Sequence, residues 1–328
     1  MNKTKLLKLT YLSIPVIILL ILPVIVSDLY VLHILIMVGI AVILATSNRL
    51  TAIPGLWNLS IIAFYGIGSY TVYFLMAYWG LSFWPALLMA GIVSGIIALG
   101  FGYATLGTKG LYFCLLTVAF LEVTRLAINE IPIFGGYKAV QVPPIDPIII
   151  PHVLTIDFAS KIPFYYLMLI LVAITLVVLY RIDKSRIGAI LESIADSEPL
   201  AQSIGINITR YKVLAFCIGS FFAGIAGGFF ASYSQVISPQ SITLWAAMIV
   251  FIAMVVGGMG SIWGSVIGAT LLTVLPELFR GAVYWEPLLV AIVVILVIFF
   301  LPGGLITLPR LFKKRLLKPT SSKTKEVP

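Results

Sequence analysis

Long apolar segments recur along this sequence, and they limit the chain to one kind of fold. A helix that crosses the hydrocarbon core of a bilayer needs roughly 20 apolar residues. About ten segments approach that length, and 61% of all residues are hydrophobic against 10% charged, which excludes a soluble globular domain. We therefore predict an all-α, polytopic protein of the cell membrane, with one membrane domain over residues 1–328. The predicted spans are Tyr11–Val26, Val31–Thr46, Leu56–Trp79, Phe83–Ala104, Leu111–Ile128, Phe164–Tyr180, Val213–Ser232, Leu244–Val256, Ile262–Phe279 and Pro287–Leu301.

The basic residues predict the orientation of these spans. With ten spans and a cytoplasmic N-terminus, 17 of the 21 Lys and Arg residues fall on the cytoplasmic side, as the positive-inside bias requires. Both termini are then cytoplasmic, and a Pro-rich stretch, Glu130–Pro163, forms an irregular cap outside. The predicted segments are six spans in 9–182, a cytoplasmic loop in 183–212, four spans in 213–305 and a basic cytoplasmic tail in 306–328.

The loop 183–212 is the long polar interruption of the chain, and its pattern predicts a folded element. Four apolar residues are spaced as one face of a short amphipathic helix: Ile187, Ile190, Leu191 and Ile194. A second short helix is indicated by Asp196–Pro199, where capping residues precede a proline. Gly205 is expected to end that helix in the left-handed conformation.

Small residues repeat at helical spacing in the span that follows the loop. Within lipid, close approach of helices depends on such residues, so we predict a packing surface formed by Ala215, Gly219, Ala223, Gly227 and Ala231. Gly260, Gly264 and Gly268 repeat the pattern in the next span but one. The run Gly257–Ser261 lacks the Gly-Lys-Ser/Thr of a phosphate-binding loop and predicts a tight turn.

Ionisable residues inside a span are functional candidates, because unpaired charges are costly in lipid. Glu122, Arg125 and Asn129 share one face of the span 111–128. They are candidates for a transport pathway, and a purely structural Glu122–Arg125 ion pair is an equal alternative. No catalytic motif or metal-ligand pattern is present, so we predict no enzyme and no metal site. The net charge of +9 comes from basic residues at the ends of apolar segments, which argues against nucleic-acid binding.

Residues 185–231, SRIGAILESIADSEPLAQSIGINITRYKVLAFCIGSFFAGIAGGFFA, resemble the permease subunits of branched-chain amino-acid ABC importers of the LivM type. Shorter pieces agree with the same family and extend the resemblance over most of the chain. These pieces are Phe64–Thr71, Leu116–Leu126, Gly257–Gly268, Leu275–Leu278 and Phe300–Leu305. One departure is Asn58-Leu59-Ser60-Ile61, where the family commonly has Ser-Leu-Gly-His.

The resemblance implies an ABC importer permease fold and a set of partners. These are a second permease subunit (LivH-like or another copy), two cytoplasmic ABC ATPases, an extracytoplasmic solute-binding protein and the lipid bilayer. It implies no cofactor on this chain, because ATP and Mg²⁺ bind the ATPases. A short cytoplasmic helix would dock on the ATPase through Glu198, Leu200, Ala201, Ile204 and Gly205. Gly66 and Gly68 are further pathway candidates.

Two alternatives to a branched-chain amino-acid importer remain open at this point. One is an ion-coupled secondary transporter that uses Glu122 and Arg125 as a relay, with Glu277 as a further candidate. The other is an ABC permease of the same family for amides, urea, sugars or nucleosides. The sequence also leaves open whether 56–79 and 244–279 cross the membrane fully or re-enter.

Overall fold

The computed structural model describes residues 20, 23, 28–108, 110–150, 154–156, 158, 160–281, 285–301 and 303–307. The predicted span Tyr11–Val26, apart from Leu20 and Pro23, lies outside these ranges, as do residues 308–328 of the predicted tail and both termini. The α-helices are α2 (Leu29–Ala52), α3 (Ile61–Trp79), α4 (Phe83–Thr105), α5 (Leu111–Glu130), α6 (Lys161–Asp183), α7 (Arg186–Asp196), α8 (Glu198–Ser203), α9 (Ile208–Ser234), α10 (Leu244–Gly257), α11 (Ile262–Phe279) and α12 (Glu286–Phe300). Short 3-10 helices are η1 (Pro132–Phe134), η2 (Pro239–Ser241) and η3 (Leu305–Thr307).

The apolar segments form helices of membrane-spanning length, as predicted. Eight helical segments in the described ranges are long and apolar enough to cross a bilayer, and Leu288–Phe300 is a shorter apolar helix. This agrees with the predicted all-α polytopic fold. Residues 244–279 form two helices, α10 and α11, which are joined by a turn at Gly258, where φ is 111°. The predicted tight turn is therefore confirmed.

Two predicted boundaries differ where the chain buries polar groups. Helix α2 continues past the expected end at Thr46 to Ala52, because its polar last turns are buried inside the protein and not exposed to lipid. Helix α3 begins at Ile61, five residues after the expected start at Leu56. The chain before it is irregular yet largely buried, a conformation tolerated at membrane depth only inside protein.

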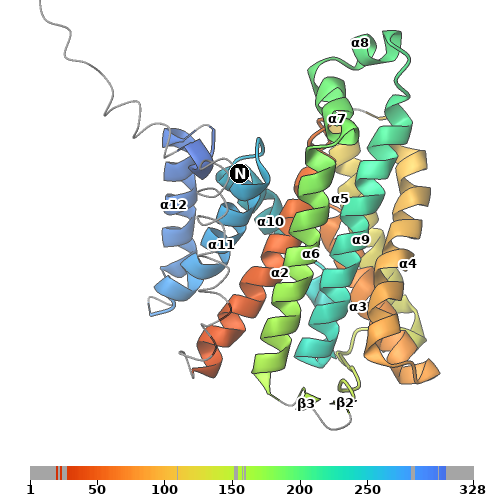
Figure 1. The fold of residues 1–328 in the computed structure, drawn as a ribbon, viewed down its shortest axis with the longest axis vertical. Helices are drawn as coiled ribbons and strands as arrows, with labels where there is room; N and C mark the ends of the chain where they lie inside the picture. Colours follow the sequence, from red (N-terminus) through yellow and green to blue (C-terminus); the bar gives the residue numbers. More distant parts are fainter. Residues whose placement is uncertain are drawn as a thin grey trace, which may run out of the picture.

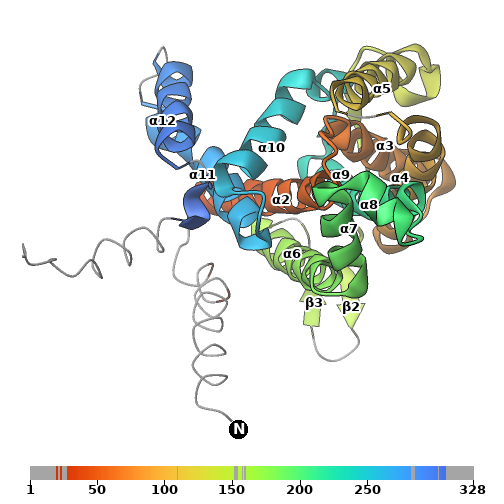
Figure 2. The ribbon, with the colours of Figure 1, turned by 90° about the horizontal axis from the view of Figure 1, so that it is seen from above.

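Helix α9 lies in the middle of the main bundle (Figure 1), where it packs against α2, α3 and α4. Helix α2 contacts α9 on one side and α6, α10 and α11 on others. Seen from above, α10, α11 and α12 extend away from the group formed by α3, α4 and α9 (Figure 2). Helices α7 and α8 lie together at one end of the bundle (Figure 1), which we call the α8 end.

The small residues of α9 lie where its neighbours approach most closely. A Cβ atom at Gly219 would lie 2.8 Å from the Ser47 carbonyl oxygen of α2, and one at Gly227 would overlap the Tyr65 carbonyl of α3. The alanines of the predicted surface, Ala215, Ala223 and Ala231, are fully buried.

The repeat in α11 is shorter than expected. A Cβ at Gly264 would overlap the Gly258 carbonyl, and one at Gly268 would overlap the Ala253 carbonyl, so both glycines allow α10 and α11 to pack closely. Gly260 does not belong to this surface. It precedes α11, in the exposed turn after α10, where a Cβ would meet nothing within 4 Å.

Short strands organise the end of the bundle opposite α8. Strand β1 (Val140–Gln141) pairs antiparallel with β4 (Val236–Ile237), and β2 (Ile148–Ile150) pairs antiparallel with β3 (Leu154–Ile156). The first pairing ties the segment after α5 to the segment after α9. The predicted cap Glu130–Pro163 thus contains small pieces of regular structure between its prolines.

Candidate coupling and pathway sites

Helix α7 has the amphipathic character that its spacing predicted. The Ser185 hydroxyl oxygen caps its N-terminus by accepting a hydrogen bond from the Ile187 N–H (3.1 Å). Leu191 and Ile194 are buried, with 0% and 1% of their surface exposed. Their burial holds α7 against the ends of the spanning helices, so the segment that follows α7 starts from a fixed support.

Helix α8 has a buried side and an exposed apolar side. Ala201 is buried, whereas Leu200 and Ile204 are 66% and 70% exposed. Gly205 has φ 84°, and the following N–H, that of Ile206, donates a hydrogen bond to the Ala201 carbonyl (3.1 Å). The predicted left-handed end of this helix is therefore confirmed. Two large apolar side chains remain in contact with solvent beside it.

Glu198, a predicted docking residue, is engaged within the chain. Its carboxylate forms an ion pair with the Lys212 ammonium group, whose side chain is only 3% exposed against 20% for Glu198. A charge buried to this degree needs such a partner. The pair fixes the start of α8 to the first turns of α9. In this structure Glu198 therefore anchors the helix, while Leu200 and Ile204 form its accessible face.

Arg49 was not among the predicted site residues. Its Nη1 lies 3.1 Å from Asp183 Oδ1, and its Nε donates a hydrogen bond to the Met259 carbonyl (2.8 Å). The Arg49 and Asp183 side chains are only 4% and 10% exposed. These contacts join α2 to the end of α6 and to the turn between α10 and α11. The sequence signal that marks it is a lone arginine three residues after the end of a long apolar segment.

A buried polar cluster lies at the irregular link between α2 and α3. The Asn58 side-chain oxygen accepts hydrogen bonds from the Ser60 N–H (2.8 Å) and hydroxyl (2.6 Å). The Thr117 hydroxyl of α5 accepts one from the Leu59 N–H (3.2 Å). Asn48 Nδ2, buried in α2, has no hydrogen-bond partner among the described residues. The cluster therefore contains the segment Asn58–Ile61, whose sequence differs from the family pattern. It also contains a buried side-chain N–H group without a hydrogen-bond partner among the described residues.

Two of the pathway candidates of α5, Glu122 and Arg125, form a partly exposed ion pair. Arg125 Nε donates to Glu122 Oε2 (2.8 Å), and the two side chains are 31% and 38% exposed. Asn129 is buried, and its Oδ1 has no partner in the described part of the chain. Gly66 and Gly68, the other candidates, are packing positions on α3: a Cβ at either one would overlap Ile242 or Gly224 respectively. A pathway role for these residues stays a prediction.

A metal site requires several ligating side chains in one place. Within the described ranges, no three His, Cys, Asp or Glu residues lie close enough together to hold a metal ion. The polar features of this region are instead ion pairs and hydrogen bonds that connect helices. These contacts can hold the helices in place and transmit movement from one helix to another. They leave the apolar side chains of α8 available for contact with another protein.

Known proteins share this sequence over most of its length. The family described as "Branched-chain amino acid transport system / permease component" matches residues 30–302. The high-affinity branched-chain amino acid transport system permease protein LivM of Salmonella typhimurium is 31% identical over 288 residues, which cover 80% of this chain and 66% of that protein. LivM of Escherichia coli is 30% identical with the same coverage. The chain thus spans slightly less than two thirds of these relatives.

Matches to other permease proteins are shorter or weaker. LivH of Salmonella typhimurium is 33% identical over 148 residues, 44% of this chain and 46% of LivH. No solved structure matches the chain.

Proposed function

The chain belongs to the branched-chain amino acid transport permease family, and we propose that it is the membrane-spanning subunit of an ATP-driven importer. Its proposed substrates are branched-chain or other hydrophobic amino acids, because the relatives are named for that transport. The chain itself would hydrolyse no ATP. It would form the translocation pathway with a second permease subunit, either LivH-like or another copy, and would receive substrate from an external solute-binding protein.

The exposed apolar face of α8 is the observation that carries this proposal. Leu200 and Ile204 are mostly solvent-exposed at one end of the bundle, and the Glu198–Lys212 pair anchors the helix that presents them. Exposed large apolar side chains on a folded support are typical of a docking surface. We assign this face to the ATPase contact.

A route from α8 into the membrane follows from the ion pairs. Movement of α8 would act on α9 directly through Lys212. Movement of α7 would act on the end of α6, where Gly188 is packed against the Asp183 backbone. Arg49 would then pass it to α2 and to the turn at Met259. Closure of the ATPases would in this way shift α9, α6 and α2 together with the turn between α10 and α11, a concerted movement of the kind that alternating access requires.

The accessible face of α8 can be tested with the double substitution Leu200→Ser, Ile204→Ser. Both side chains are exposed, so insertion and thermal stability should stay unchanged, while burial of two large side chains, about 1.5–3 kcal/mol each, is lost from the ATPase contact. We expect ATPase copurification and ATP-driven leucine uptake into vesicles to fall at least tenfold. Wild-type binding and uptake by this variant would overturn the ATPase assignment.

Gly205 offers a matched pair of variants for the same contact. Gly205→Val places a β-branched residue at φ 84° and should weaken both binding and uptake, since such strain costs about 1–3 kcal/mol. Gly205→Asn should stay near wild type because Asn tolerates this conformation. If the two variants show equal ATPase binding and equal uptake, the left-handed conformation at the end of α8 is not needed for the mechanism.

An ion-coupled secondary transporter is the second candidate, supported by the partly exposed Glu122–Arg125 pair in α5. The two candidates differ in their energy source. Uptake that follows an ion gradient in vesicles without ATP, by the chain without its ATPase partners, would favour the second. Uptake that requires ATP on the side of the vesicle membrane where α8 lies favours the importer. Competition by amides, urea, sugars or nucleosides in the same assay tests the substrate.

A further inference from the structure

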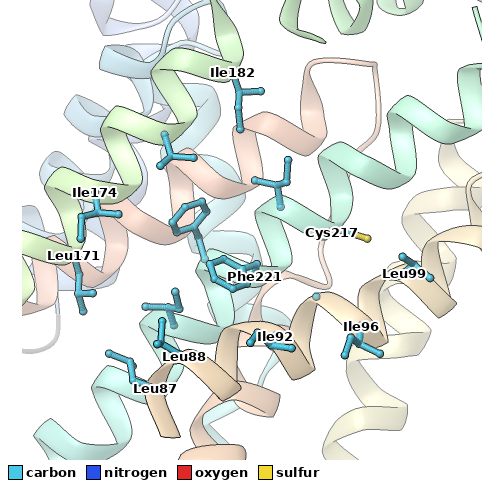
Figure 3. Close-up of a pocket in the computed structure, with 15 residues that line it drawn as sticks. Leu87, Leu88, Ile92, Ile96, Leu99, Leu171, Ile174, Ile182, Cys217 and Phe221 are labelled. Carbon is cyan, nitrogen blue, oxygen red and sulfur yellow. The ribbon is translucent and has the colours of Figure 1, made fainter. Parts of the chain in front are cut away.

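An apolar groove runs along the main bundle between α4 and α6, with α9 as its floor (Figure 3). Its volume is about 700 Å³. Ile96 of α4 and Ile174 of α6 form opposite walls, and Cys217 and Phe221 lie on α9 between them. All fifteen lining residues are apolar side chains or glycine. Such a groove offers a ligand dispersion contacts and no hydrogen bonds.

The groove exists because α4 and α6 meet α9 differently. Helix α4 packs closely on α9, where Gly91 lies near the Phe221 ring and Gly224 lies against Ser94. Helix α6 makes far fewer close approaches to α9. Gly95 lines the gap without a side chain to fill it.

The length of the groove matches one leaflet of a membrane. On α4 the lining residues run from Leu87 to Leu99, which is about 18 Å at 1.5 Å per residue. Half of a hydrocarbon core of about 30 Å is roughly 15 Å. One extended acyl chain therefore has the right length and chemistry for this groove.

Exposed basic residues lie at one end of the groove, where Ile182, the residue after Arg181, is still part of the lining. Arg181 follows Ile174 by seven residues on α6, and Arg210 precedes Cys217 by seven on α9, so each lies two helical turns from a wall residue on the same face. On both helices the step from the wall residue to the arginine runs toward the α8 end. Tyr103, 59% exposed, has the same relation to Ile96 on α4. Among the described residues neither arginine side chain forms an ion pair, and Asp183, which is close to Arg181 in the sequence, is paired with Arg49.

We propose that the groove holds an acyl chain of an anionic phospholipid, with its phosphate bound by Arg181 and Arg210. The apolar walls account for the chain, and the two arginines account for a negative headgroup at that depth. Basic clusters between spanning helices recognise such headgroups in the leaflet that carries anionic lipid. A lipid held here would contact α4, α6 and α9 together and would stabilise the spacing of α6 from α9.

Photocrosslinking of the full-length chain tests this site. The probe is a phosphatidylglycerol with a diazirine in its acyl chain, diluted into phosphatidylcholine vesicles, and the readout is the crosslinked peptides. We expect label in α4, α6 and α9 on residues of the groove. Ile174→Trp should abolish this label by filling the groove. Each of Arg181→Gln and Arg210→Gln should lower it about fivefold, since one basic residue near the membrane contributes about 1 kcal/mol.

Ile170→Trp is the matched control, because Ile170 is 56% exposed on the same helix, against 50% for Ile174, and lies outside the groove. It should leave the label unchanged. Equal labelling by a phosphatidylcholine probe would contradict the anionic headgroup. Label that survives Ile174→Trp would contradict the groove itself. Absence of label from the assembled transporter, with label on the chain alone, would show that a protein helix covers the groove instead.

Discussion

Helices α9 and α5 have similar hydropathy but opposite surroundings. Their most apolar windows have mean hydropathies of 2.0 and 1.8, yet 72% of the α9 window is buried in this chain against 28% of the α5 window. Hydrophobicity places both helices in the bilayer and does not decide which one forms the core. Side-chain size decides it, because small residues let helices approach each other and large ones keep them apart.

The charges of the two helices differ in the same way. Lys212 of α9 is buried and paired with Glu198, whereas Glu122 and Arg125 of α5 are about one third exposed. The α9 pair is part of the scaffold. The α5 pair lies on a face that the described residues leave partly exposed, which suits a pathway or a partner subunit. Variants of each helix test this division between scaffold and pathway.

The largest effect is expected for Lys212→Met. This change removes the Lys212 ammonium group from the Glu198 carboxylate, and removal of one member of a buried pair costs about 3–5 kcal/mol. Because Glu198 is 20% exposed, we expect a value near the lower end, measured as a fall in thermal stability in detergent. Lys212→Met with Glu198→Gln should recover part of the loss. If the single variant is as stable as wild type, α9 gains nothing from this pair.

Gly227→Ala should be the next most damaging. The added methyl group would overlap the Tyr65 carbonyl, and overpacking of a filled core costs about 1–3 kcal/mol. Gly100→Ala is the control, since a Cβ at Gly100 meets nothing within 4 Å; it should keep or slightly raise stability through better helix propensity. Equal stability of the two variants would show that α3 and α9 can separate without cost.

Glu122→Gln should have the smallest effect on stability and a clear effect on transport. An ion pair with this exposure contributes about 0–1 kcal/mol, so unfolding should hardly change. Uptake by the assembled transporter should fall if α5 faces the pathway. Glu130→Gln, at the end of the same helix, controls for loss of any carboxylate. Wild-type uptake by Glu122→Gln would leave the pair with a structural role alone.

Local patterns predicted much of this molecule. Helix α11 begins and ends at the predicted residues, Ile262 and Phe279, because apolar length and flanking turn residues act within a short stretch. The conformation of Gly205 followed from its position after a capped, proline-containing helix. Spacing alone wrongly predicted that Gly260 belongs to a packing surface. The residue lies before helix α11 begins.

Long-range pairing was not accessible from such patterns. Glu198 has a partner fourteen residues away and Arg49 has one 134 residues away, and neither distance is encoded in a helical repeat. Asn58 and Ser60 are buried although their backbone is irregular. Their burial likewise depends on α2 and α5 meeting around the link to α3.

Apolar segment length specifies a multi-pass helical membrane protein, and the polar pattern of residues 183–212 specifies a folded loop between two sets of spans. The physical reason is local: each apolar segment must satisfy its own backbone hydrogen bonds in lipid. Which charges pair depends on how distant segments meet in the fold, where Glu198 anchors α8 and Arg49 joins three parts of the chain. The fold also sets which helix faces stay exposed, because a helix is covered only where its side chains are small enough for a neighbouring helix to pack against it.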